Sequence, residues 1–453
     1  MILREWETKS FDNYSAKIPD LVDYLSHVWE NRNMYVDNIE EENTEENVTN
    51  EKVQKQGFFS FSHDNKITAH NYVGAIQYED IRIEVMPKIF EKSEKADSGK
   101  WQLNLLYWLS YCRKIRFPFS FATVSDLHFD DYLEVMIYVF ANHTAEVLFT
   151  QPYQSYQSIE EETAFLRGRL SFDNYAKHNL STGKWQNFQC IHEPFAYDNL
   201  FNRIVKYVSK RLLAVSSNFA TREKLNGILF LLDDVSDVLC TASDCSKVKL
   251  NSLYEEHGHI LELCRMFMSN LVIDMQNEQS KNFCFLLPME YIFEDFIFGF
   301  ISEKFPELNI VSQSSDYLAR REGKKVFQIK NDMYIKDRLI IDTKYKKRDS
   351  PNDPKAGVSQ NDIYQMIGYA ISRNCKNVLM IYPEVGIERA ASDAVSFEIP
   401  SGMIQGYLNI DIRNIDITFD DIRFAEQKIL EQIRMMDPVF RERVVDGIGH
   451  AVA

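Results

Sequence analysis

Alternation of helical and strand patterns in residues 281–453 is the feature that most limits how this chain can fold. Apolar residues recur at helical spacing in one segment and at strand spacing in the next. The segments follow one another as helix 288–305, strands 326–330, 333–335 and 338–345, helix 362–374, strand 377–383, strands within 396–418 and a helix at 421–436. Alternating helices and strands predict an α/β domain over residues 281–453.

Two regions with different patterns precede this domain. Residues 1–95 contain alternating apolar residues with turn residues between them, which predicts a β-rich N-terminal domain. Residues 96–280 carry apolar residues at helical spacing and are predicted to be mainly helical, with an irregular interruption near 151–170. The acidic, polar run at 39–56 is predicted to be a solvated loop.

Composition restricts the classes of protein to which the chain can belong. Its 453 residues carry a net charge of −16, so contact with nucleic acid is expected only at a local basic patch. The seven cysteines form no CxxC pair, which favours reduced, buried thiols. The N-terminal segment lacks the apolar core of a signal peptide, and no apolar run approaches the length of a membrane span. We therefore expect a cytoplasmic protein.

A strand that should be buried, LIIDTKYKK at residues 339–347, ends in an acid and a cluster of bases. Asp342 and Lys344 are two residues apart and therefore share one face of the strand. If the preceding hairpin loop consists of residues 336–338, Asp332 falls opposite Asp342 on that same face. A two-residue turn would place the two acids on opposite faces, so the sequence leaves both arrangements open.

Two carboxylates and a lysine on one face of a strand could bind a metal ion and a phosphate. Adjacent carboxylates repel each other unless a cation lies between them, and Mg²⁺ prefers oxygen ligands. A nearby lysine can stabilise charge on a phosphate or orient a water molecule. These groups suffice for metal-dependent hydrolysis of a phosphodiester. A charged strand end is, however, commonly just solvated surface, and Asp342 with Lys344 alone favours that interpretation.

Three neighbouring features favour the catalytic interpretation. Residues 324–348 contain nine Lys and Arg and three acids, a local net charge of +6 that suits a phosphate backbone. Glu290 and Glu294 lie one helical turn apart and could supply another metal ligand. Gln365 and Tyr369 share a face of the next helix and could reach substrate or metal-bound water, although an ordinary amphipathic helix has the same spacing.

The site residues resemble the PD-(D/E)xK nuclease superfamily in type and order: Glu294, Asp332, Asp342-Thr-Lys344 and a helix with Gln365 and Tyr369. More narrowly, the chain resembles the McrC nuclease subunits of McrBC modification-dependent restriction systems. The motifs behind this narrower resemblance are YVGAIQYEDIRIEVMPKI (72–89), FLRGRL (165–170), YDNLFNRIVKYV (197–208), MEYIFEDFI (289–297) and QNDIYQMIGYA (360–370). Asn331 stands where the superfamily has proline, and the second acid is aspartate, as in McrC-like proteins.

The resemblance implies that residues 281–453 form a PD-(D/E)xK endonuclease domain. Such a domain would use Mg²⁺ to cut double-stranded DNA, in this branch DNA that carries a modification. The resemblance assigns the residues of the site two kinds of role: as metal ligands Asp332, Asp342 and Glu294, and as catalytic or supporting groups Lys344, Gln365 and Tyr369.

The same resemblance implies a partner protein. McrC-like proteins act with McrB, an AAA+ ring that binds and hydrolyses GTP, and residues 1–95 would contact this ring. The chain itself contains no GxxxxGK[ST] nucleotide-binding motif. Two alternatives remain open. A RecB-like repair nuclease would have no such partner, and the motif at 72–89 argues against it. A non-catalytic activator of an AAA+ protein would not need the complete set Asp332, Asp342 and Lys344.

Overall fold

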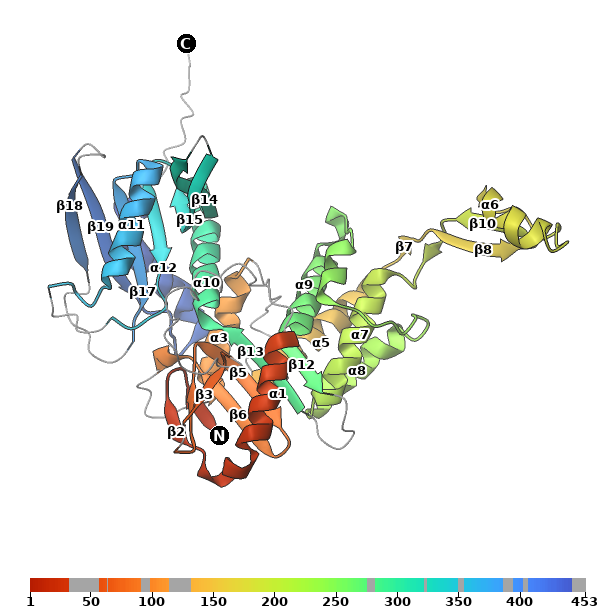
Figure 1. Ribbon diagram of the computed structural model, residues 1–453, viewed down its shortest axis with the longest axis horizontal. Coiled ribbons are helices and arrows are strands. Elements are labelled where there is room, and N and C mark those ends of the chain that lie inside the picture. The colour runs from red at the N-terminus through yellow and green to blue at the C-terminus, as the bar shows by residue number, and fades with distance from the viewer. Residues whose placement is uncertain are drawn as a thin grey trace, which may run out of the picture. The chain divides into compact units, whose positions relative to one another are not determined.

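The chain forms two compact units (Figure 1). The computed structural model describes residues 1–31, 57–62, 64–90, 98–113, 132–274, 282–321, 324–348, 354–385, 394–401 and 406–441. The first unit contains the described residues of 1–132 and 284–453, and the second those of 133–283. The acidic run at 39–56 lies outside the described residues. No helix in the described ranges is long and apolar enough to cross a membrane.

The N-terminal part of the first unit is β-rich, as predicted, and also contains a helix. In one sheet, neighbouring strands follow the order β1 (Ile2–Arg4), β6 (Ile81–Met86), β5 (Tyr72–Tyr78) and β13 (Asn282–Pro288). A second sheet has the order β2 (Thr8–Ser10), β4 (Lys66–Ala69) and β3 (Phe59–Phe61). Helix α1 (Ile18–Asn31) buries Leu21, Leu25 and Val28, whose spacing places them on one helical face.

Gly74 allows β5 and β13 to approach each other closely. Its φ is +141°, and a Cβ atom at this position would lie 2.1 Å from the carbonyl oxygen of Phe285. Only glycine combines this backbone conformation with so close an approach of another main chain. The glycine of the Val-Gly element in the 72–89 motif is therefore required by the close packing of β5 against β13.

Six strands between residues 311 and 415 form the mixed sheet of the predicted α/β domain. Their order in the sheet is β14 (Val311–Arg321), β15 (Lys324–Ile335), β16 (Leu339–Thr343), β17 (Asn377–Pro383), β19 (Gly406–Ile415) and β18 (Val395–Ser401). The pairs β16–β17 and β17–β19 are parallel, and the other three pairs are antiparallel. The two strands predicted at 326–330 and 333–335 are one continuous strand, β15.

Helix α11 (Gln360–Arg373) lies against this sheet (Figure 1). It contributes Met366, Tyr369 and Ala370 to a core that also contains apolar side chains of β16, β17 and β19. Helix α12 (Ala425–Met436) follows the last strand and buries Ile429 and Ile433. The predicted helices at 362–374 and 421–436 are thus confirmed, with small shifts at their ends.

Helix α3 (Ser98–Tyr111) belongs to the first unit, whereas the sequence placed residues 96–113 in the helical middle region. The reason is an aromatic contact with α10 (Met289–Lys304): Trp108 and Tyr111 lie against Phe296, with ring centroids 6.5 Å and 6.0 Å apart. Helical spacing alone does not reveal which partner an apolar face packs against. The N-terminal and C-terminal regions likewise fall in one unit rather than in two separate domains.

The second unit is mainly helical, as predicted for most of residues 96–280. Its longer elements are α5 (Tyr132–Thr150), α7 (Leu200–Val215), α8 (Phe219–Leu231), α9 (Glu255–Asn270) and the strand β12 (Leu271–Asp274). The side chains of Asn199 and Asn218 cap α7 and α8 by accepting hydrogen bonds from main-chain N–H groups. Short helical turns in the two units lie at 12–17, 88–90, 172–174, 175–180, 242–247, 252–254, 306–308, 422–424 and 438–440.

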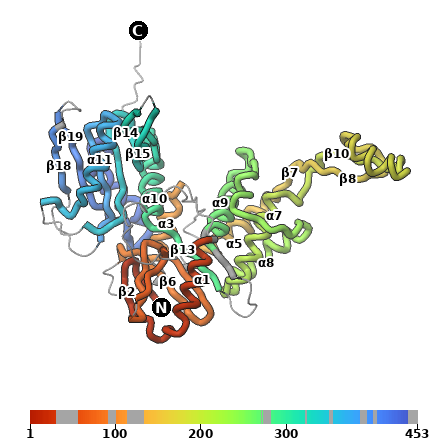
Figure 2. The backbone as a smooth tube through the Cα atoms, in the orientation of Figure 1, coloured from red at the N-terminus to blue at the C-terminus, as the bar shows by residue number. Residues whose placement is uncertain are grey.

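A small β structure, which we call the β lobe (residues 155–196), begins in the irregular interruption predicted near 151–170 and continues into residues that were predicted to be helical. It contains β7 (Ser155–Tyr156), β8 (Ile159–Thr163), β9 (Arg169–Leu170), β10 (Phe188–His192) and β11 (Phe195–Ala196). Figure 2 shows the lobe extending away from the helices of its unit. Strand β8 was missed because its sequence, IEEET, has no apolar alternation. Gly168 of the FLRGRL motif has φ +67°, and a Cβ there would lie 2.4 Å from the carbonyl oxygen of Ile191.

Candidate active site

The hairpin between β15 and β16 has the three-residue loop that places Asp332 beside Asp342. Ile335 pairs with Leu339, and Met333 pairs with Ile341. Continuing this register by one residue brings Asp332 opposite Asp342. The Asp332 carboxylate accepts hydrogen bonds from the main-chain N–H and the hydroxyl of Thr343, both at 2.8 Å. The three-residue loop considered from the sequence is therefore the one that forms.

Asp342 is completely buried and has a raised pKa. Burial, followed by the charge of Asp332, raises its pKa to about 7, and the nearby Lys344 ammonium only partly opposes this shift. Lys344 Nζ lies 2.8 Å from Asp342 Oδ2. Burial lowers the pKa of Lys344, but the charges of Asp342 and Asp332 outweigh burial and raise it above its ordinary value. The lysine therefore stays protonated beside the carboxylate.

The oxygens of Asp342 lack the partners that a buried carboxylate normally has. Within the described residues, Oδ1 has no hydrogen-bond partner, and the close partner of Oδ2 is the Lys344 ammonium at 2.8 Å. A buried carboxylate with a single donor is costly, and a metal ion can satisfy its remaining lone pairs. The incompletely satisfied carboxylate of Asp342 thus fits an oxygen-preferring cation such as Mg²⁺.

A chain of hydrogen bonds holds Lys344 from the side of α11. Its ammonium group donates to Gln365 Oε1 at 3.0 Å, and Gln365 Nε2 donates to the Tyr369 hydroxyl at 2.8 Å. The buried Tyr369 hydroxyl in turn donates to the carbonyl oxygen of Lys330 at 2.7 Å. The structure therefore brings Lys344, Gln365 and Tyr369 together. The i, i+4 spacing of Gln365 and Tyr369 on α11 lets the two side chains form one hydrogen-bonded chain to Lys344.

Glu294 contacts the site indirectly. Its side chain accepts a hydrogen bond of 3.2 Å from Gln313 of β14, which lies between the ladder pairs Ser312–Met333 and Ser314–Asn331. The carboxylates of Glu294, Asp332 and Asp342 do not all lie within 4.8 Å of one another. Glu290, one turn earlier in α10, is exposed, and its charge acts on Glu5 and Lys88. Asp332 and Asp342 therefore form the centre of the site, and Glu294 lies at its edge.

A second group of buried polar residues, which the sequence did not reveal, supports the strand end from the N-terminal part of the unit. Lys88 donates from Nζ to the carbonyl oxygen of Tyr345 at 2.7 Å, and its ammonium lies 4.1 Å from the centre of the Tyr345 ring. Glu5 accepts from the Tyr345 hydroxyl at 2.7 Å and from the Lys88 main-chain N–H at 2.9 Å. Only the Pro-Lys-Ile element of the 72–89 motif pointed to Lys88, and nothing pointed to Glu5.

Lys346 and Asp362 form another contact near the site. Lys346 Nζ lies 2.5 Å from Asp362 Oδ2, and the buried Tyr382 hydroxyl donates to the same oxygen at 3.4 Å. Lys346 is therefore paired with an acid, whereas Lys347 is exposed. The basic run after Asp342 thus divides into residues with different environments.

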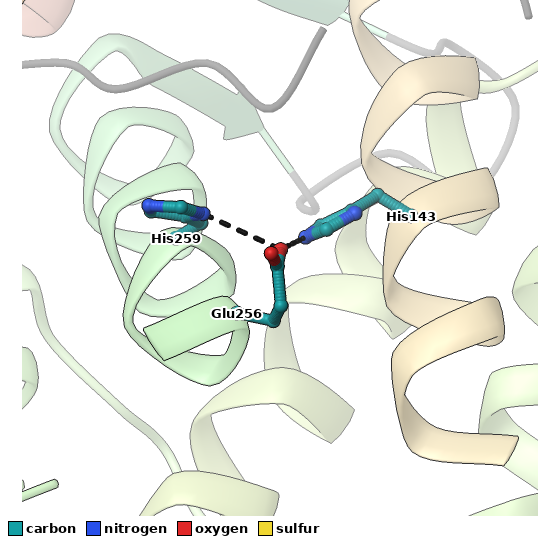
Figure 3. Close-up of side chains that lie close together, drawn as sticks. All are labelled: His143, Glu256 and His259. Atoms are coloured by element: carbon teal, nitrogen blue, oxygen red, sulfur yellow. Dashed lines mark hydrogen bonds and ion pairs between the residues drawn. The ribbon is translucent and has the colours of Figure 1, made fainter. Parts of the chain in front are cut away.

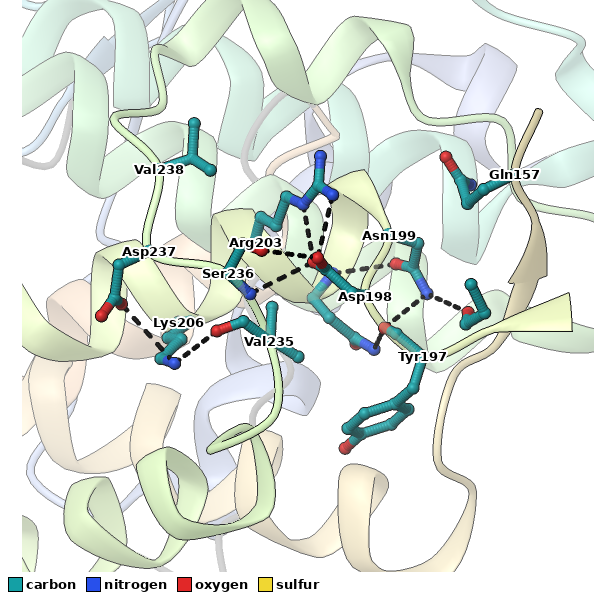
Figure 4. Close-up of polar contacts among 12 residues, drawn as sticks. Gln157, Tyr197, Asp198, Asn199, Arg203, Lys206, Val235, Ser236, Asp237 and Val238 are labelled. Atoms are coloured by element: carbon teal, nitrogen blue, oxygen red, sulfur yellow. Dashed lines mark hydrogen bonds and ion pairs between the residues drawn. The ribbon is translucent and has the colours of Figure 1, made fainter. Parts of the chain in front are cut away.

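The YDNLFNRIVKYV motif (197–208) forms a network of hydrogen bonds in the second unit and is not part of the candidate site (Figure 4). Asp198 accepts from Arg203 Nε at 2.6 Å and from the Ser236 hydroxyl at 2.6 Å, and the Arg203 contact lowers its pKa to about 2. Asn202 donates to the carbonyl oxygens of Tyr153 and Tyr197. These bonds fix the start of α7 in the second unit.

The fold and the site together define an α/β protein with a buried acid–lysine site at the end of a central strand. A family model described as "McrBC 5-methylcytosine restriction system component" matches residues 67–383. The chain belongs to this family. The match includes the strand of Asp342 with Lys344 just beyond its end, the helix of Gln365 and Tyr369, and the β lobe.

Solved structures from Thermococcus gammatolerans are similar to this chain. One is a chain in the refined half-complex from a tetradecameric assembly of McrB AAA+ hexamers with bound McrC. Its TM-score is 0.64 at 18% sequence identity, with 96% of this chain and 100% of that chain covered. Another, from the cryo-EM structure of the McrBC complex, has a TM-score of 0.47 at 18% identity and covers 66% of this chain and 86% of that chain. The first likeness establishes the fold. No curated protein matches the sequence.

Proposed function

We propose that this protein is the Mg²⁺-dependent DNA endonuclease subunit of a McrBC-type modification-dependent restriction system, with a PD-(D/E)xK nuclease domain in its C-terminal region. The observation that carries the proposal is Asp342, a fully buried carboxylate next to Asp332, with Oδ1 unpartnered and Oδ2 2.8 Å from the Lys344 ammonium. This combination of two neighbouring acids, one with an unpartnered oxygen, and a protonated lysine suits hydrolysis of a phosphodiester. Membership of the McrBC family agrees with it.

Each residue of the site would have a distinct task. Asp342 and Asp332 would hold Mg²⁺, and Glu294 would be the next candidate for a ligand. When bound, the ion would supply polarisation of the scissile phosphate and of the attacking water. Lys344 would stabilise negative charge that develops on the phosphate. Gln365 would hold the Lys344 ammonium in place, because its Oε1 accepts a hydrogen bond from it and Tyr369 fixes its amide. Lys344 would exchange its contact with Asp342 for one with the phosphate.

The hairpin of β14 and β15 supplies a surface for the DNA backbone. In its ladder Arg320 faces Lys325 and Arg321 faces Lys324, and all four side chains are exposed. Like charges directly opposite each other destabilise a strand pair, so this arrangement favours a polyanion as ligand. Lys324 and Lys325 of this patch lie on β15, the strand that carries Asp332. The hairpin thus provides a local basic patch for DNA in a chain whose total charge is negative.

The proposed partner is an McrB-like AAA+ ring that binds GTP. The structurally similar chain comes from an assembly in which McrC is bound to McrB hexamers, and this sequence contains no nucleotide-binding motif of its own. Two surfaces are candidates for the contact. Residues 1–95 are the surface that the family resemblance implies. The β lobe exposes several large apolar side chains, a property typical of interaction surfaces: Tyr156, Phe165, Leu166, Phe172, Trp185 and Phe195.

One experiment separates this function from its alternatives. The purified chain is incubated with its AAA+ partner, GTP, Mg²⁺ and plasmids with or without modified cytosine. We expect cleavage of modified plasmid, loss of cleavage in Asp342→Asn, and unchanged stimulation of GTP hydrolysis by that variant. Cleavage that persists in Asp342→Asn contradicts the site. Stimulation by a wild-type protein that never cleaves identifies an activator, and cleavage that is independent of the partner identifies a repair-type nuclease.

A further inference from the structure

Three side chains in the second unit point at a common centre away from the nuclease site (Figure 3). His143 comes from α5, and Glu256 and His259 come from adjacent turns of α9. His143 Nε2 lies 3.3 Å and His259 Nδ1 lies 3.4 Å from the same oxygen of Glu256. The three atoms all lie within 4.8 Å of one another. None of these three residues belongs to a motif that the sequence predicted to be functional.

The two distances from Glu256 match the edges of a metal polyhedron. N–H···O hydrogen bonds in proteins have donor–acceptor distances near 2.9–3.0 Å, so both contacts are long for hydrogen bonds. Nitrogen and oxygen ligands at about 2.0–2.1 Å from a tetrahedral zinc ion are separated from each other by about 3.3–3.4 Å. The two distances from Glu256 therefore equal those between ligands around one ion.

The surrounding structure fixes the two helices that carry the ligands. On one side of the cluster, Phe140 of α5 and Phe267 of α9 are in edge contact, with ring centroids 5.7 Å apart. On the other side, the buried His257 ring nitrogen Nε2 lies 2.9 Å from the carbonyl oxygen of Gln151. His257 thus has its own partner in the core. It orients α9 so that Glu256 and His259 face His143.

We propose that His143, Glu256 and His259 bind one zinc-type divalent cation that links α5 to α9. Two imidazoles and one carboxylate suit Zn²⁺, whereas Mg²⁺ prefers oxygen ligands alone. The Glu256 side chain is 57% exposed, which leaves the fourth coordination position open to water. The proposal is independent of the proposed nuclease function, because its ligands all belong to the second unit.

Cobalt binding tests the site directly. The full-length chain with Asp342→Asn, which disables the proposed nuclease site, is freed of metal by chelation and dialysis and titrated with Co²⁺. We expect one Co²⁺ per chain, with visible d–d absorption of tetrahedral intensity that Zn²⁺ abolishes and excess Mg²⁺ leaves unchanged. The thiols are buried, so the near-ultraviolet band of thiolate ligands should be absent.

Single substitutions assign the ligands. His143→Gln and His259→Gln should each abolish the spectrum and the rise in Tm that Zn²⁺ produces. His178→Gln, which changes an exposed histidine of the β lobe, should keep both. The circular dichroism of each variant shows whether it folds, and the more exposed His259 provides a second test if His143→Gln does not. A spectrum that is absent in the parent, or equal in all variants, overturns the proposal.

Discussion

Lys88 donates a hydrogen bond of 2.7 Å to the main-chain carbonyl of Tyr345, the residue that follows Lys344. The contact ties the Pro87–Ile89 segment of the N-terminal part to the end of the strand that carries the candidate site. Because the chain leaves the sheet at this point, the bond restrains the main chain on which Lys344 stands.

Replacement of Lys88 should weaken catalysis without removing a catalytic group. Lys88→Met keeps most of the side chain's length and loses the donor to Tyr345, so we expect kcat for DNA cleavage to fall about tenfold to a hundredfold, as for small displacements of catalytic groups. The KM for DNA should change little. Lys9→Met, which removes an exposed lysine, serves as the control. An unchanged kcat in Lys88→Met would show that this hydrogen bond does not position Lys344.

Metal affinity should depend on pH through Asp342. The pKa of this carboxyl is raised to about 7 by burial and by Asp332, so a proton competes with the ion at lower pH. We expect the affinity for Mg²⁺ to fall by up to about tenfold per pH unit below pH 7 and to level off above it. Calorimetry in buffers of different ionisation enthalpy should detect the released proton. Affinity that is flat between pH 5.5 and pH 8 is inconsistent with a protonated Asp342.

Glu5 should make the folded protein less stable as pH rises. Burial raises its pKa to about 7, above its ordinary value of 4.5, so the folded state holds a proton that the unfolded state releases. The stabilisation is present below pH 4.5 and is lost as pH rises through 7, an effect of about 2 kcal/mol between pH 5 and pH 8.

Denaturant titrations of wild type and Glu5→Gln across this pH range measure the effect. The stability of the glutamine variant should depend less on pH, since glutamine does not titrate. Glu7→Gln, two residues away and partly exposed, is the matched control. If the pH dependence of Glu5→Gln equals that of wild type, Glu5 does not titrate in this window.

Charge removal at the β14–β15 hairpin should weaken DNA binding and leave the fold intact. Arg320→Ala with Lys325→Ala removes one like-charged cross-strand pair, so the free energy of unfolding should stay equal or rise. The slope of log K against log salt should become shallower by about 0.9 for each DNA phosphate that the variant no longer neutralises. Lys247→Ala with Lys249→Ala, in the second unit, controls for total charge. An unchanged slope would place the DNA elsewhere.

Two exposed tryptophans can locate the surface that binds the AAA+ partner. Trp185 of the β lobe is 69% exposed and Trp6 of the N-terminal part is 58% exposed. If the lobe binds the partner, Trp185→Ala should reduce the stimulation of GTP hydrolysis at least tenfold, as for hot-spot aromatics, whereas Trp6→Ala should not. The opposite result supports the N-terminal part. Binding affinity measured alongside stimulation distinguishes weaker binding from weaker activation.

Local pattern in the sequence was enough to predict the α/β alternation of the C-terminal region and the elements that carry Asp342, Lys344, Gln365 and Tyr369. Periodicity reports which face of one strand or helix is buried, and it does so without reference to distant residues. The strand predicted at 377–383 and the helix predicted at 362–374 therefore agree with β17 and α11 closely.

Tertiary structure decided the remaining features, because each depends on the path of the chain between residues far apart in sequence. The three-residue loop at 336–338 sets the register of β15 against β16, and in this register the Asp332 carboxylate accepts a hydrogen bond from the Thr343 main chain. Glu5 meets the Tyr345 hydroxyl across 340 positions, a pairing that no local pattern encodes. Strand β8 forms from a run of glutamates only because β10 supplies its hydrogen-bond partners. His143, Glu256 and His259 meet only when α5 and α9 pack together.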